Sequence, residues 1–160
     1  MSYPKYLRIL IEALAPRMGY TLIPPHPEIK VETNRLPWLK DWLRYWGVKL
    51  EHIPLDNIYY MASEEDMLNI IAWDWIDKRK WISQKFDCDD FAFAFKSHVS
   101  EYFGLNQVGW VNDYSGRHSF NLIIFPTGHL WVFEPQTDSF AFLNERNRDT
   151  YPMERGLLLL

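Results

Sequence analysis

Apolar residues in the first half of the chain recur every three or four positions, which is the spacing of an amphipathic helix. This pattern predicts helices over 3–18, 38–46 and 63–77. The prolines within 24–27 remove backbone donors and predict an irregular or extended connector that reaches residue 35. Ser63 precedes three acidic residues, an arrangement typical of a helix N-cap and its first turn.

The strongest helix signal lies in the middle of the chain. Asp87 suits an N-cap, and Asp90, three residues later, suits its capping-box partner. Apolar positions then recur nearly every four residues until Gly104 ends the pattern: Phe91, Phe95, Val99 and Tyr102. The sequence therefore predicts a helix whose first turn carries Cys88, the only cysteine of the chain.

After this helix the apolar period changes to two, which is typical of strands. Strands are predicted over 108–112, 118–125, 130–134 and 140–143. The turns between them are too short for a crossover, so consecutive strands are antiparallel. The chain is therefore predicted to have an α+β fold, with N-terminal helices and the helix carrying Cys88 packed on an antiparallel β-meander. We expect a single domain over 1–160, with its core at 60–145 and a helical elaboration at 1–59.

Composition excludes two classes of protein. The chain has 160 residues, 48% hydrophobic and 24% charged, with a net charge of -4 and a pI of about 5.7. This acidic balance argues against a nucleic-acid partner. No apolar run approaches the ~20 residues of a membrane span, and the four leucines at 157–160 are too few. One cysteine cannot form an internal disulfide, so a cytoplasmic location is expected.

Aromatic residues are abundant, with eight Trp, nine Tyr and ten Phe. Their simplest interpretation is a bulky core. The alternative is a surface on which sugars or bases stack, and composition does not choose between the two.

Cys88 is the first candidate for chemistry. Backbone N–H groups and the positive end of the helix dipole lower the pKa of a thiol at this position. The carboxylates of Asp87, Asp89 and Asp90 act in the opposite direction, so a protonated imidazole beside the sulfur would be needed to activate it.

His118 is the favoured imidazole, because it opens a strand whose neighbour ends in Glu134. A turn centred near Thr127 places Gln136 opposite His118 and makes Glu134 a diagonal neighbour on the same face. A carboxylate at this position would fix the tautomer of the imidazole, and Gln136 could take the same role. The remaining histidines are expected to be surface or structural residues: His26, His52, His98 and His129.

The strings DCDDFA, HSFN and EP, which begin at Asp87, His118 and Glu134, resemble the papain-like/transglutaminase-like cysteine peptidase superfamily. They look most like its compact bacterial, phage and fungal members, one of which is the papain-like module attached to a mushroom agglutinin. The resemblance covers about 81–137. It implies that Cys88 is the nucleophile, His118 the general base and acid, and Glu134 the orienting acid.

The activity implied by this resemblance is cleavage of a peptide or amide bond through a thioacyl intermediate, in a peptide or protein substrate and with no cofactor. Gln84 is then the candidate second donor of the oxyanion hole, beside the Cys88 backbone N–H, and Gln136 and Asn121 are the other candidate support residues.

Three alternatives stay open. An acyl-transferase of the same fold would differ from the hydrolase only in that an amine, rather than water, accepts the acyl group. A non-catalytic binding protein on this scaffold would recognise a partner or a glycan. A metal-binding module would hold Ca²⁺ or Mn²⁺ through Asp87, Asp89 and Asp90, because hard cations prefer several carboxylate oxygens, and the agglutinin module that the chain resembles depends on metal.

Overall fold

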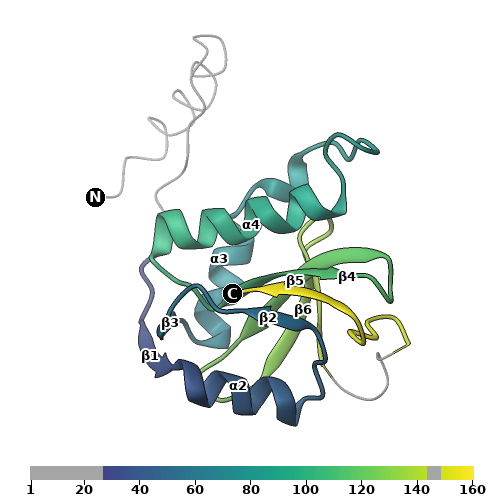
Figure 1. Cartoon of the computed structure of the whole chain (residues 1–160). Helices are drawn as coiled ribbons and strands as arrows, with labels where there is room; N and C mark the ends of the chain where they lie inside the picture. The colour runs from purple at the N-terminus through teal and green to yellow at the C-terminus, as the bar shows by residue number, and fades with distance from the viewer. Residues whose placement is uncertain (1–26, 144–148) are drawn as a thin grey trace, which may run out of the picture.

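The structure, a computed structural model, describes residues 27–143 and 149–160 (Figure 1). The predicted helix over 3–18 and His26 lie outside the described residues. Three helices and a short 3-10 turn are described: α2 (Leu36–Tyr45), α3 (Glu64–Trp73), η2 (Ile76–Lys78) and α4 (Cys88–Phe103). Together with the strands, they confirm the α+β class.

The main sheet has six strands in the order β2-β8-β4-β5-β6-β7. The bounds of its strands are β2 (Glu51–Ile53), β4 (Val108–Asp113), β5 (His118–Ile124), β6 (Leu130–Glu134), β7 (Ser139–Phe142) and β8 (Gly156–Leu159). Strands β4 to β7 form the predicted antiparallel meander, whereas β2 and β8 pair in parallel. A separate antiparallel pair joins β1 (Glu32–Arg35) to β3 (Ile58–Met61).

Several elements differ from the prediction. Three of the four leucines at 157–160 belong to β8, which lies inside the sheet, between β2 and β4. Together with β2, this strand extends the sheet beyond the predicted core at 60–145. Strand β1 lies in the stretch expected to be an irregular or extended connector. Helix α3 ends at Trp73 rather than residue 77, because the Asp74 carboxylate accepts a hydrogen bond of 2.9 Å from the Ile76 N–H and so begins the 3-10 turn.

Helix α4 begins and ends as the sequence predicts. The Asp87 N–H donates a hydrogen bond of 3.2 Å to the Asp90 carboxylate, which is half of a capping box. At the other end Gly104 has a φ of 65°, a left-handed conformation that costs glycine little. The position of Cys88 at the helix start is therefore set by local sequence signals.

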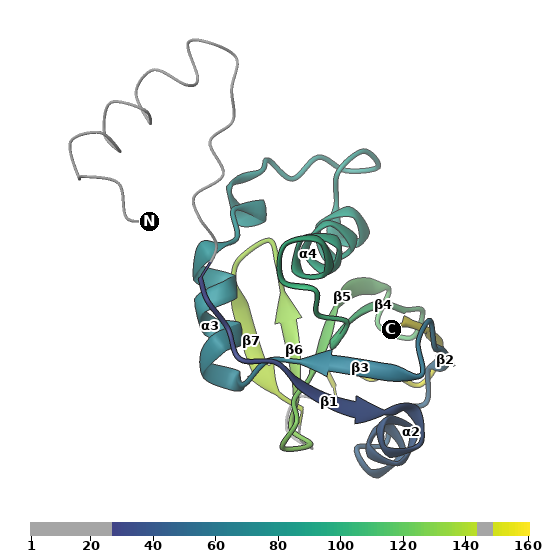
Figure 2. The same cartoon turned by 90° about the vertical axis from the view of Figure 1, so that its left-hand side faces the viewer.

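Each face of the sheet has its own hydrophobic cluster. Alternate residues of β5 belong to different clusters: Leu122 packs with the residues of α2, and Ile123 packs with those of α3 and α4. Figure 2 shows α2 and α4 on opposite sides of the sheet. No helix among the described residues has both the length and the apolar composition that crossing a bilayer requires.

Candidate functional site

The strand register brings His118 and Glu134 together as predicted. Asn121 faces Phe133 across β5 and β6, so continuation of the register places Phe120 opposite Glu134. The His118 Nε2 atom lies 2.8 Å and 2.9 Å from the two carboxylate oxygens of Glu134. The side chains are 30% and 14% exposed, which leaves the imidazole accessible and the carboxylate largely covered.

Tyr151 completes this group, and sequence reasoning missed it. Its hydroxyl donates a hydrogen bond of 2.9 Å to Glu134 Oε1, and its ring packs edge-on against Phe120 at 4.9 Å. Tyr151 reaches the site from the segment before β8, and no local pattern links that segment to β6. We call His118, Glu134 and Tyr151 the imidazole–carboxylate cluster.

The contacts within this cluster shift the pKa values of His118 and Tyr151. The hydrogen bond to Glu134 raises the pKa of His118, and desolvation by burial opposes that effect. Burial and the hydrogen bond to Glu134 both raise the pKa of Tyr151, so its hydroxyl keeps its proton and acts as a donor. The cluster therefore consists of one carboxylate held between a titratable imidazole and a phenol.

Asp113 is a second residue that the sequence did not single out. It is fully buried at the end of β4, directly across from His118. Its carboxylate accepts hydrogen bonds from the backbone N–H groups of Ser115 (2.9 Å), Gly116 (3.2 Å) and Met153 (2.9 Å). Asp113 thus holds the β4–β5 turn and the segment leading to β8 in the positions that surround His118.

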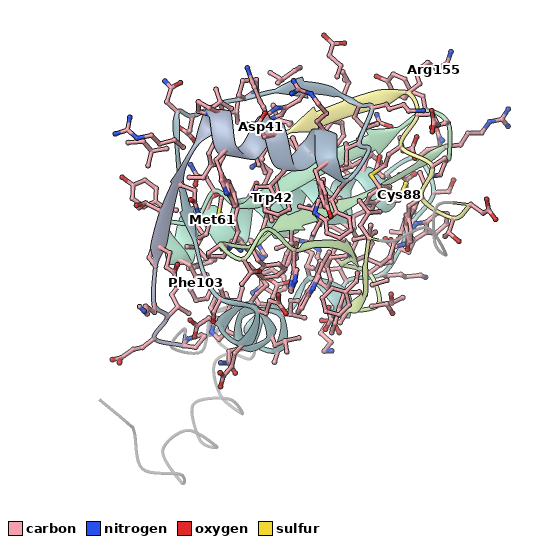
Figure 3. The ribbon with its side chains drawn as sticks, turned by 90° about the horizontal axis from the view of Figure 1, so that it is seen from below. Asp41, Trp42, Met61, Cys88, Phe103 and Arg155 are labelled. Atoms are coloured by element: carbon pink, nitrogen blue, oxygen red, sulfur yellow. The ribbon has the colours of Figure 1, made fainter. Side chains whose placement is uncertain are left out.

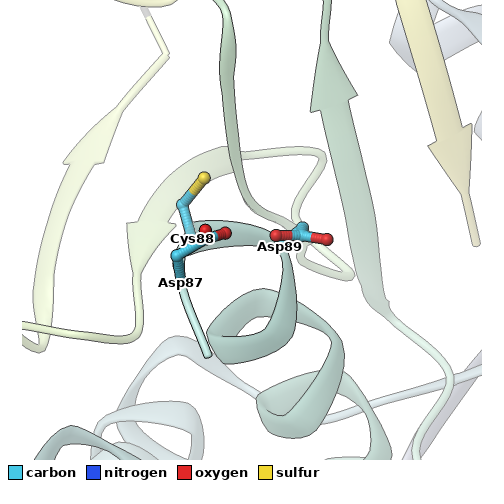
Figure 4. A group of neighbouring side chains, drawn as sticks. All are labelled: Asp87, Cys88 and Asp89. Atoms are coloured by element: carbon cyan, nitrogen blue, oxygen red, sulfur yellow. The ribbon is translucent and has the colours of Figure 1, made fainter. Parts of the chain in front are cut away.

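Cys88 is half-buried, as the first residue of α4. Its thiol makes no hydrogen bond with any residue in 27–143 or 149–160. Figure 4 shows the sulfur extending away from the helix end, with the carboxylates of Asp87 and Asp89 close together beside it. The hydrogen bond between these carboxylates lowers the pKa of Asp87 and raises that of Asp89. One ligand atom from each of the three residues lies within 4.8 Å of the others.

The predicted support residues occupy different environments. Gln84 is exposed, and its backbone N–H donates a hydrogen bond of 2.7 Å to Asp87, which organises the helix start. Gln136 is half-buried, with an Oε1 atom that has no partner among the described residues. Asn121 is fully buried, and its amide donates to the carbonyls of Ala92 (2.8 Å) and Gly109 (3.1 Å). The structure thus gives Asn121 a place between α4 and the sheet. Asp90, a candidate metal ligand, caps α4.

Comparison with known proteins relates this α+β fold to lectins. No protein-family description matches the sequence, and no curated protein matches it. Two solved structures do share the fold, each with a TM-score of 0.63, 18% identity and 80% of this chain covered. One is a complex of PSL1a with E64. The other is the Polyporus squamosus lectin bound to the human-type influenza-binding epitope Neu5Acα2-6Galβ1-4GlcNAc. The chain spans about half of each, 51% and 49% of their lengths.

These findings contradict the cysteine peptidase assignment, because the two structures just described are of a lectin and no family description matches the sequence. Four predictions change with it: the peptidase superfamily, the cysteine hydrolase with its triad, the enzymatic activity, and the peptide or protein substrate. The α+β class is confirmed, and its papain-like/transglutaminase-like version is not. The alternative of a non-catalytic binding module agrees better with lectin neighbours.

Proposed function

We propose that this chain is a non-catalytic binding module for glycans, and that the imidazole–carboxylate cluster contacts the ligand. The observation that carries the proposal is the pre-ordered arrangement of His118, Glu134 and Tyr151. The lectin fold supports the glycan as ligand class. The chain spans about half of that lectin, and the proposed site consists of this chain's own residues.

The chemistry of the cluster suits sugar hydroxyls. Each hydroxyl of a sugar donates one hydrogen bond and accepts others, so it is bound by donors and acceptors held side by side. Glu134 supplies acceptor oxygens. His118 supplies its second ring nitrogen, Nδ1, which no described residue engages. Since Glu134, itself held by the Tyr151 hydroxyl, already fixes the imidazole, binding costs little additional ordering of side chains.

The first experiment measures binding of Neu5Acα2-6Galβ1-4GlcNAc, and of Galβ1-4GlcNAc without the sialic acid, by calorimetry or ligand-observed NMR. We expect saturable binding that His118→Ala weakens at least tenfold. The matched control is His129→Ala, because His129 and Glu64 form a similar imidazole–carboxylate pair, at 2.6 Å, elsewhere on the chain. This control variant should bind as the wild type does.

Two results would overturn the proposal. One is equal binding by the His118 and His129 variants, which would show that the imidazole–carboxylate cluster does not contact the glycan. The other is turnover of a peptide or amide substrate that Cys88→Ala abolishes, which would show that the module is catalytic.

A divalent cation is a second candidate ligand, because Asp87, Cys88 and Asp89 converge at the start of α4. We propose Ca²⁺ or Mn²⁺, since carboxylate oxygens suit hard cations. Either ion should raise the melting temperature of the wild type and have little effect on Asp89→Asn. Equal shifts for both proteins, or none, would exclude this site.

The domain and location predictions stay proposals. A single domain over 1–160 should unfold in one cooperative transition, which denaturant titration with two spectroscopic probes measures. A cytoplasmic location agrees with the lone thiol, and fractionation of the source cells tests it.

A further inference from the structure

A cavity lies between α2 and β2, and none of the residues of the imidazole–carboxylate cluster line it. Its volume is about 470 Å³, within the range of ~300–1,000 Å³ typical of small-molecule sites. It is formed because the chain leaves α2 through Gly47, whose φ of 65° is left-handed, and then turns back toward β2. Figure 3 looks onto α2, which lies across the strands of the sheet.

The cavity combines an apolar floor with a cationic rim. The floor consists of Leu43 and Leu50, which are 5% and 8% exposed, together with the half-buried Val48. Lys40 and Arg44 stand one turn apart on α2 and so project from the same side of the helix.

Lys49 adds a third cation from the loop before β2, and no acidic residue is among those lining the cavity. An apolar floor beneath three cations suits a ligand that joins a negative group to an apolar body.

The acidic residues near the rim form only weak ion pairs with its cations. Arg44 contacts Asp41 at 3.4 Å, and Lys49 contacts Glu154 at 2.6 Å. All four side chains are more than half exposed, between 56% and 81%, and ion pairs this exposed are weak. A ligand can therefore draw both cations toward itself. Lys40 makes no ion pair with another residue in the described ranges.

His52 is another residue that lines the cavity. Its Nε2 atom is buried and has no hydrogen-bond partner among the described residues. Desolvation by burial, and then the charge of Lys40, lower the pKa of His52, so its imidazole is neutral at pH 7. A neutral imidazole in the lining adds no fourth charge to the three cations.

We propose that this cavity binds a small organic anion, with its negative group held by Lys40, Arg44 and Lys49 and its apolar part resting on Leu43 and Leu50. The carboxylate of an acidic sugar and that of a free organic acid share this chemistry. The proposal does not depend on the glycan site, because it uses none of the residues of that site.

The experiment titrates the wild-type chain with benzoate, using backbone amide NMR. Benzamide serves as the neutral probe of nearly the same shape, and inorganic phosphate as the anion with no apolar part. Benzoate should produce saturable shifts at Gly47, Val48 and Lys49, and benzamide should bind at least tenfold more weakly. Phosphate should also bind more weakly than benzoate, since it cannot use the floor.

Single substitutions test which cations bind the carboxylate of benzoate. Lys40→Gln and Arg44→Gln should each weaken benzoate binding about fivefold, while Lys85→Gln, which removes an exposed lysine far along the chain, should not. His118→Ala should keep benzoate binding even where it loses glycan binding.

Equal affinity for benzoate and benzamide would overturn the role of charge. Phosphate binding as tight as benzoate would overturn the organic part of the ligand. Shifts centred outside residues 40–52 would overturn the site itself. N-acetylneuraminate and acetate then distinguish an acidic sugar from a simple acid as the source of the carboxylate.

Discussion

Replacement of Asn121 by alanine tests whether this buried amide joins α4 to the sheet. The amide makes two hydrogen bonds, to the carbonyls of Ala92 and Gly109. Each contributes a net ~1 kcal/mol, and the small cavity left by the amide adds about 1 kcal/mol. The Asn121 Oδ1 atom is buried without a described partner, so its removal returns up to ~1 kcal/mol. The net loss of unfolding free energy is therefore about 2–3 kcal/mol.

Urea denaturation of the wild type and Asn121→Ala measures this loss, and it corresponds to a fall in melting temperature of about 4–12 °C. Asn121→Asp should lose more, because a buried carboxylate would then face two carbonyl oxygens. Asn112→Ala is the matched control on β4. Its half-exposed side chain makes no hydrogen bond with a described residue, so its stability should stay within ~0.5 kcal/mol of the wild type. Equal losses for Asn121→Ala and Asn112→Ala would refute the structural role given to Asn121.

Three further predictions concern stability. Gly128→Ala should cost about 3 kcal/mol in a denaturant titration, because Gly128 has a φ of 86° and an added Cβ would clash with the Trp42 ring. A loss below ~1 kcal/mol would contradict this. Burial, and then the charge of Asp77, raise the pKa of Asp138 to about 6. The folded state therefore binds the proton of the Asp138 carboxyl more tightly than the unfolded chain does. As a result, the stability of the fold falls as pH rises from about 4 to 6. Asp138→Asn should therefore raise the melting temperature at pH 7 and leave it nearly unchanged near pH 4, and an equal effect at both pH values would refute the assignment. The pKa of His118 is also raised in the folded state, by its hydrogen bond to Glu134. The charge pair therefore stabilises the fold fully below the ordinary imidazole pKa, and this stabilisation is lost as pH rises through the pKa of the folded state. His118→Gln should consequently lose more stability near pH 5 than near pH 8, and the reverse order in thermal melts would contradict the pairing.

Sequence signals predicted α4 and the meander because those signals are local. Caps at Asp87 and Gly104 define the helix, and alternation with short turns defines β4 to β7. The same locality fixed the register that pairs His118 with Glu134.

The remainder depends on contacts between distant segments. Strand β8 is a run of leucines with no polar alternation, so its buried and half-buried positions emerge only when it packs between β2 and β4. Tyr151 reaches Glu134 for a similar reason, since the path of the segment before β8 follows from tertiary packing. The predicted activity was wrong because residue types at a helix start and on two strands indicated a thiol enzyme, whereas two solved structures that share the fold are of a lectin.

The position of β8 between β2 and β4 affects how the chain assembles. Glu51 of β2 pairs with Leu157 of β8, so the sheet is complete only after segments from far apart in the chain have met. Closing so long a loop costs entropy before any contact repays it, which favours slow folding. Until β8 arrives, the flank of β4 exposes unpaired backbone groups, and this is the surface through which partly folded copies would aggregate.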